Sequence, residues 1–145
     1  MGLRSYRDLD VWRVAIDLVA EIYHVTSKFP STEMYGLTSQ LRRAAVSIPS
    51  NIAEGYGRGQ RRDYIRCLRV ARGSLAEVET QLVVVARIGL GDRNSLGNAW
   101  QLCQRVGAML TAQIRSLRRG THTEAEDALP DSRFPIPDSR SEEAP

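Results

Sequence analysis

The sequence contains little of what disulfides, metal sites and catalytic centres are built from. Its 145 residues include two cysteines, two histidines and a single lysine, Lys28. Cys67 and Cys103 fall at predicted helical positions without metal-ligand spacing, which indicates reduced packing thiols in a cytosolic protein. His24 and His122 lie far apart in the sequence. We therefore predict neither a disulfide nor a histidine-based metal site.

Long apolar runs and catalytic patterns are missing as well. No run of about eighteen apolar residues predicts a membrane span, and "MGLRSYRDLDVW" lacks the apolar core of a signal peptide. There is no Glu-x-x-His repeat of the kind that di-iron bundles need, and no serine or cysteine has a candidate base nearby. We expect a cytoplasmic protein that is not an enzyme and has no cofactor or metal.

Charge is distributed unevenly along the chain. Residues 121–145 carry seven acids and two arginines, a net charge of −5, whereas residues 1–120 carry eighteen bases and ten acids, a net charge of +8. All but one of those eighteen bases are arginines, and arginine binds phosphate in a fork and stacks on bases. Because residues 121–145 also hold four prolines and no periodic apolar pattern, we expect a disordered acidic tail there.

Apolar residues recur at threes and fours over four segments, which predicts helices at residues 8–27, 32–54, 61–88 and 95–119. Short links between four amphipathic helices favour an all-α, up-down antiparallel four-helix bundle over residues 1–120. No alternating β-branched run indicates a strand. The third helix has a heptad seam, and Gly73 inside it suggests a close helix crossing. The seam consists of Tyr64, Leu68, Ala71, Leu75, Val78, Leu82 and Val85. The stripe of the fourth predicted helix consists of Leu96, Trp100, Cys103, Val106, Leu110, Ile114 and Leu117.

The first helix offers a less regular pattern. Its predicted core stripe consists of Leu9, Trp12, Ile16, Val19, Tyr23 and Thr26. Further apolar residues lie off the predicted stripes: Val11, Leu18 and Val25 on this helix, and Val70 and Val84 on the third. Two interpretations stay open, namely incidental surface residues or a second apolar face used for self-association.

The stretch "SIPSNIAEGYGRGQRRDY" interrupts the helical pattern at residues 47–64. The second helix has a stripe of Met34, Leu37, Leu41, Ala44, Ile48 and Ile52. Because this period holds phase on both sides of Pro49, we predict a bent but continuous helix there. The following glycines form no phosphate loop, because the Gly-Lys-Ser/Thr ending is missing and the stretch follows a helix. Gly55 or Gly57 is expected to cap the helix instead, and Ser31 or Thr32 to cap its start.

Two polar sets are candidates for function. On the second helix, one sector holds Gln40, Arg43, Ser47, Asn51 and Glu54. We favour a structural or subunit-contact role for this polar line, with a ligand or RNA contact as the alternative. The second set consists of Arg58, Arg61, Arg62, Arg66, Arg69 and Arg72, with Asp63 the one acid among them.

These six arginines form a contiguous basic stripe, with Arg58 just before the predicted third helix and the other five on it. Arg62, Arg66 and Arg69 share one side, and Arg61 and Arg72 lie between that side and the seam. Like charges this close destabilise a helix unless phosphates, an acidic partner or the acidic tail neutralise them. A solvated helix face is the plain interpretation, and nucleic-acid binding is the one we favour. Tyr56 and Tyr64 flank the stripe and could stack on bases, although Tyr64 fits the core better.

Three stretches also carry a family resemblance: "YRDLDVW", "FPSTEMYGLTSQLRRAAVSIPSNIAEGYGR" and "GSLAEVETQL". Their order and spacing resemble the four-helix bundle proteins of 23S rRNA intervening sequences, often labelled S23 ribosomal proteins. The related accessory variability determinant of diversity-generating retroelements belongs to the same family. The resemblance covers about residues 5 to 118, as judged from these motifs, and includes the "SIPSNIAEG" signature.

The resemblance implies a cytosolic bundle that assembles as a ring-shaped homopentamer and lacks catalytic activity. It also implies a basic surface for RNA or DNA and, in the retroelement branch, association with a reverse transcriptase. Our leading hypothesis is a non-enzymatic oligomeric nucleic-acid-binding protein. The alternative is an interaction scaffold that docks an acidic protein partner or a reverse transcriptase through the same basic face.

Overall fold

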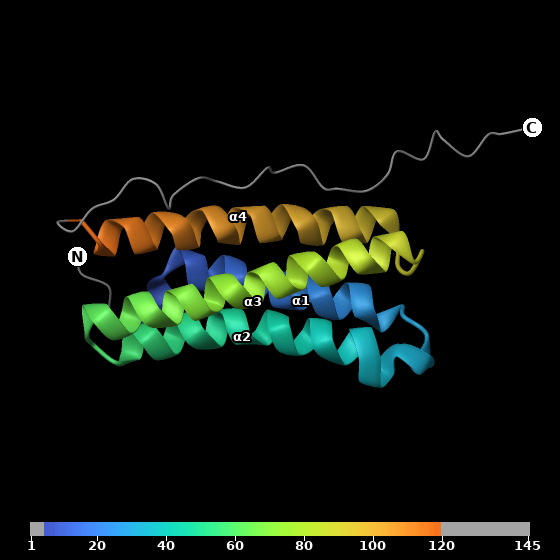
Figure 1. Ribbon diagram of the computed structural model, residues 1–145, viewed down its shortest axis with the longest axis horizontal. Helices are drawn as coiled ribbons and strands as arrows, with labels where there is room; N and C mark the ends of the chain where they lie inside the picture. Colours follow the sequence, from blue (N-terminus) through green and yellow to red (C-terminus); the bar gives the residue numbers. More distant parts are fainter. Residues whose placement is uncertain (1–4, 120–145) are drawn as a thin grey trace, which may run out of the picture.

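The computed structural model describes residues 5–119, and this part of the chain is helical without strands. The long helices are α1 (Asp10–Ser27), α2 (Ser39–Gly57), α3 (Arg61–Arg87) and α4 (Arg93–Leu117). Figure 1 shows them side by side along one axis, with consecutive helices running in opposite directions. The all-α bundle predicted from the sequence is confirmed. The predicted tail, residues 121–145, lies outside the described residues.

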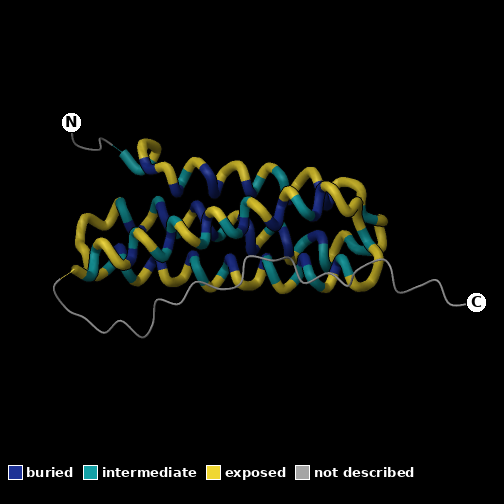
Figure 2. Tube along the Cα trace, turned by 90° about the horizontal axis from the view of Figure 1, so that it is seen from above, coloured by how far each residue is buried: buried dark blue, intermediate teal, exposed yellow. Residues whose placement is uncertain are grey.

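The core consists of one apolar side from each helix (Figure 2). All seven seam residues predicted on α3 are buried, from Tyr64 to Val85. On α4, Leu96, Trp100 and Cys103 are buried together with the apolar residues that follow at Val106 and Leu110. The heptad and threes-and-fours patterns of these two helices therefore predicted the core correctly.

The core face of α1 differs from the predicted stripe. Val11, Leu18 and Val25, predicted to lie off the stripe, are 5%, 0% and 1% exposed, whereas Ile16 and Tyr23 are 40% and 45% exposed. Leu9 and Thr26, at the two ends of the predicted stripe, are buried, but its middle part lies beside the core, with Trp12 and Val19 half-buried. The prediction was wrong because α1 has two adjacent apolar faces, and both satisfy helical spacing.

The second helix begins later than predicted. A 3₁₀ turn (Ser31–Glu33) and a π turn (Met34–Thr38) precede α2, and Gly36 has non-helical dihedral angles of φ −108° and ψ −115°. Neither Ser31 nor Thr32 makes the predicted capping hydrogen bond. Met34 was predicted to be in the core and is 49% exposed. Since the helical phase breaks at Gly36, the spacing of Met34 does not carry over into α2.

Pro49 lies inside α2, and the helix continues through it as predicted. Leu41, Ala44, Ile48 and Ile52 are buried on both sides of the proline. The Asn51 amide Nδ2 donates to the Ser47 carbonyl over 2.8 Å, which places a side-chain donor inside the turn that holds the proline. The bend at Pro49 itself stays a prediction.

Glycines act at other positions than the sequence indicated. Gly55 and Gly57 are both helical, and the left-handed residue after α2 is Gly59, at φ +73°. Gly55 instead permits close packing, because a Cβ atom there would lie 2.6 Å from Cβ of Cys67 on α3. Gly73 is exposed and nothing lies within 4 Å of its Cβ position, so the predicted close crossing does not occur there.

Candidate nucleic-acid interface

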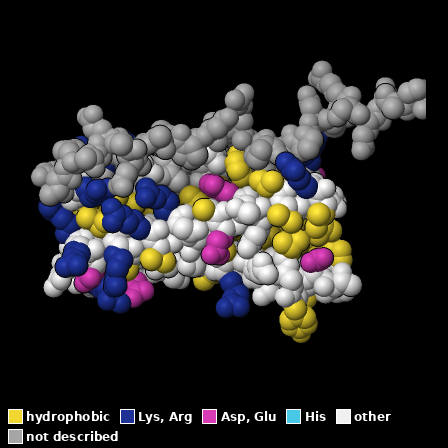
Figure 3. Space-filling view, viewed as in Figure 1, with side chains coloured by type: hydrophobic (Ala, Val, Ile, Leu, Met, Phe, Trp, Pro, Cys, Tyr) yellow, Lys and Arg dark blue, Asp and Glu magenta, His cyan; other side chains and the backbone are white. Residues whose placement is uncertain are grey.

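The arginine stripe predicted from the sequence lies at the start of α3. Arg61, Arg62, Arg66 and Arg69 are exposed, and Arg72 is half-buried. Arg58, just after the end of α2, is exposed as well. Figure 3 shows Lys and Arg side chains gathered at one end of this face of the molecule, where Figure 1 places the beginning of α3. The core seam is on another side of α3, and none of these six arginines belongs to the core.

The bundle brings a second group of arginines to the same level. Gly107 of α4 faces Leu75 of α3, because a Cβ atom at Gly107 would meet Cδ2 of Leu75 at 3.3 Å. From this contact, Arg62 is about 20 Å away along α3, and Leu117, the last residue of α4, is about 15 Å away along antiparallel α4 in the same direction. Arg115 and Arg119 are exposed and Arg118 is half-buried.

We call these nine residues the arginine patch: Arg58, Arg61, Arg62, Arg66, Arg69, Arg72, Arg115, Arg118 and Arg119. Sequence spacing alone did not indicate Arg115, Arg118 and Arg119 at the end of α4 and just after it, although an antiparallel bundle places the end of α4 near the beginning of α3.

Only one ion pair is formed by the α2–α3 part of the patch within the described residues. Nη2 of Arg58 donates to Oε1 of Glu54 over 2.6 Å. This hydrogen bond, followed by the charge of Glu54, raises the pKa of the Arg58 guanidinium. Arg61, Arg62, Arg66 and Arg69 have no ion-pair partner in the described part of the chain. These four arginines of the patch therefore present unneutralised positive charge to solvent.

The polar line of α2 divides into two groups. Ser47 and Asn51 join a network between α2 and α3, in which Ser47 Oγ lies 2.8 Å from Ser74 Oγ and Asn51 Nδ2 lies 3.1 Å from Ser47 Oγ. Glu54 pairs with Arg58. Gln40 and Arg43 are exposed on the same helix. Ser47 and Asn51 therefore contribute to the packing of α2 on α3, whereas Gln40 and Arg43 are exposed to solvent.

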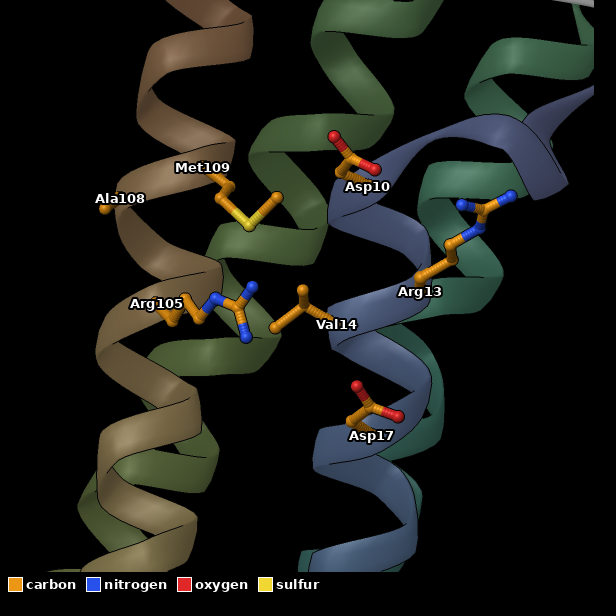
Figure 4. A pocket seen from close by; sticks show the side chains of 7 residues that line it. All are labelled: Asp10, Arg13, Val14, Asp17, Arg105, Ala108 and Met109. Atoms are coloured by element: carbon orange, nitrogen blue, oxygen red, sulfur yellow. The ribbon is translucent and has the colours of Figure 1, made fainter.

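A separate groove lies between α1 and α4, with a volume of about 610 Å³. Figure 4 shows Arg105 of α4 pointing toward α1, where Asp10 and Asp17 line the groove. Arg13 points away from α4, and its Nε donates to the Arg7 carbonyl over 3.0 Å. The groove thus mixes both charge signs, and its charge does not favour a polyanion.

Buried titratable groups give no sign of a reactive centre. Both cysteines are buried free thiols. Burial, with a smaller effect of the Glu79 charge, raises the pKa of the Cys103 thiol, which keeps it protonated and unreactive. Burial also raises the pKa of Glu79. Within residues 5–119, no His, Cys, Asp and Glu side chains cluster in a way that could hold a metal ion. No helix in that range has the length and apolar character to cross a membrane.

Fold and site together define a class: small all-α bundles with one strongly basic end. Comparison with protein-family models makes the assignment more specific. The model described as 23S rRNA-intervening sequence protein matches residues 7–112, and the chain belongs to this family. The resemblance noted from the sequence motifs is thereby confirmed for the family. A search of curated proteins finds no match to the chain.

Proposed function

We propose that this protein binds RNA or DNA without catalysing a reaction, and that the arginine patch contacts the phosphate backbone. The observation that carries the proposal is the group of exposed arginines at the start of α3, four of which have no ion-pair partner among the described residues. One guanidinium group can donate two parallel hydrogen bonds to the oxygens of a phosphate, and the release of counterions supplies much of the binding free energy. The family name, which refers to an intervening sequence of 23S rRNA, agrees with a role connected to nucleic acid.

A salt titration tests this proposal on the full chain. If three to five arginines contact phosphates, the affinity for duplex DNA should fall roughly fortyfold to five-hundredfold between about 50 and 200 mM salt. Single-stranded RNA should show a shallower slope, because it has fewer condensed counterions. Fluorescence anisotropy with labelled oligonucleotides measures both slopes. Absence of binding at about 50 mM salt would favour the alternative, a protein partner on the same face.

We also propose that the protein assembles with copies of itself. Four residues of α1 form an uncharged band beside the core: Trp12, Ile16, Val19 and Tyr23. Val46 of α2 is 40% exposed and lies one turn after Arg42, whose Nε donates to Thr26 Oγ1 of α1 over 2.9 Å. The Arg42 guanidinium also covers the Tyr23 ring at 4.4 Å. Val46 therefore extends the α1 band onto α2, and we call this surface the α1–α2 face.

A second apolar surface lies at the end of the bundle opposite the arginine patch. Tyr35 is 96% exposed in the turn before α2, and Val84 and Ile88, at the end of α3, are 42% and 57% exposed. Figure 3 shows hydrophobic side chains gathered at that end of the molecule. Two different apolar surfaces on one subunit suit a heterologous interface, which forms a ring when the rotation between neighbouring subunits closes. A pentamer is the size implied by the family resemblance.

Replacing Ile16 or Val46 by arginine should dissociate the assembly, because a charge would be buried in an apolar contact. We expect the parent protein to sediment as an oligomer at micromolar concentration and Ile16→Arg and Val46→Arg to sediment as monomers. Gln101→Arg is the matched control, since Gln101 is exposed on α4, outside both apolar surfaces. A monomeric parent protein would contradict self-assembly, and an oligomeric Ile16→Arg variant would contradict the use of the α1–α2 face.

A further inference from the structure

The α2–α3 part of the arginine patch carries positive charge that the described part of the protein does not balance. The α2–α3 part of the patch contains one ion pair, Arg58 with Glu54. Arg62, Arg66 and Arg69 share one side of α3 and are exposed. Positive charges at this spacing repel one another. A flexible polyanion that reached them would therefore be attracted along the length of the stripe.

In the same chain, an acidic segment follows α4 in the sequence. Residues 121–145 carry Glu124, Glu126, Asp127, Asp131, Asp138, Glu142 and Glu143 against Arg133 and Arg140. Arg119, the last described residue, is at the patch end of the bundle and belongs to the patch. Fully extended, 25 residues span about 80 Å, whereas α3, with 27 residues, is about 40 Å long. Every arginine of the stripe is thus within reach of the segment.

We propose that residues 121–145 bind the arginine patch of their own chain and compete there with nucleic-acid phosphates. Guanidinium groups bind carboxylates in the same forked geometry as phosphates. The covalent connection raises the local concentration of carboxylates to the millimolar range, so weak individual contacts suffice. Because exposed charge pairs are screened by salt, the segment should leave the patch as ionic strength rises. The competition part of this inference rests on the proposed nucleic-acid binding, and the docking part does not.

The test compares two full-length variants. In the neutralised variant, the seven acids become the corresponding amides, from Glu124→Gln to Glu143→Gln. In the matched control, each aspartate of the segment becomes glutamate and each glutamate becomes aspartate, which keeps the charge. All buried core residues belong to residues 9–114, so both variants retain the core, and circular dichroism checks the fold.

Arginine reactivity is the first readout, because it requires no nucleic acid. Phenylglyoxal modification, followed by peptide mass spectrometry, reports the exposure of each guanidinium. At about 50 mM salt we expect Arg62 and Arg66 to react several-fold faster in the neutralised variant than in the control, and the two variants to converge at about 1 M salt. Arg87 is exposed on α3 outside the patch and should react equally in both variants.

The second readout is the affinity for a single-stranded RNA of about 20 nucleotides, which we expect to be about tenfold higher for the neutralised variant at low salt. Equal reactivity of Arg62 and Arg66 in the two variants would overturn the docking, whatever the RNA result. Different reactivity with equal RNA affinity would overturn the competition alone. Different reactivity without RNA binding by either variant would support the docking and contradict the proposed nucleic-acid function.

Discussion

Reversing the charge of two exposed patch residues, Arg62→Glu together with Arg66→Glu, is expected to weaken RNA and duplex DNA binding about a hundredfold at about 50 mM salt. Each substitution removes a candidate phosphate contact and adds a negative charge that repels the backbone. The salt slope should become shallower by about two units, one for each lost contact. Both side chains are exposed on α3 and away from the buried seam, so the fold should not change.

A matched control separates the patch from net charge. Arg87→Glu together with Arg105→Glu changes the net charge equally, and both residues are exposed outside the patch. Assembly of each variant is checked first by sedimentation, and affinities are then compared by fluorescence anisotropy. If Arg62→Glu/Arg66→Glu binds as the parent does, the stripe is only a solvated helix face. An equal loss in the control would mean that net charge, and not the patch, accounts for binding.

Truncating Leu18 to alanine should lower the free energy of unfolding by about 2–5 kcal/mol, as expected for a cavity left by a fully buried leucine. Leu18 is 0% exposed, whereas Ile16, two residues earlier on α1, is 40% exposed. Ile16→Ala loses less apolar burial and leaves no enclosed cavity, so its effect should remain within about 1 kcal/mol. The pair therefore tests which of the two apolar faces of α1 packs in the core.

Urea unfolding followed by circular dichroism measures both variants. The experiment is run at two protein concentrations, because any contribution from assembly appears as a concentration dependence. A larger loss for Ile16→Ala than for Leu18→Ala, at both concentrations, would mean that the stripe predicted from the sequence is the core face and that the packing described for α1 is wrong.

Several features of this protein could be read directly from the sequence. The heptad seam of α3 and the apolar stripe of α4 predicted their buried residues, because each of these helices has one dominant apolar side. The period around Pro49 predicted that α2 continues, since Leu41 and Ala44 on one side and Ile48 and Ile52 on the other stay in phase. The exposure of Arg62, Arg66 and Arg69 followed in the same way from the position of the seam.

Other features depended on where neighbouring helices lie. On α1, two faces have the spacing of a core stripe, and packing against α2 and α4 buries the one that contains Leu18. The α1–α2 face then remains at the surface. The predicted start of the second helix at residue 32 was too early, because Gly36 breaks the helical phase between Met34 and α2. Helical periodicity reports only that a face is apolar and does not report which partner covers it.

The sequence by itself determined the helices, most of the core and the basic stripe, because these follow from residue spacing within one segment. Tertiary structure decided the rest. The antiparallel packing of α4 on α3 brings Arg115, Arg118 and Arg119 to the stripe, although more than forty residues separate them from Arg72 in the sequence. The packing of α2 on α3 likewise makes Gly55 a position of close approach, where a Cβ atom would lie 2.6 Å from Cβ of Cys67. Contacts of this kind form between segments that are distant in the sequence. Local patterns of spacing or charge therefore do not predict them.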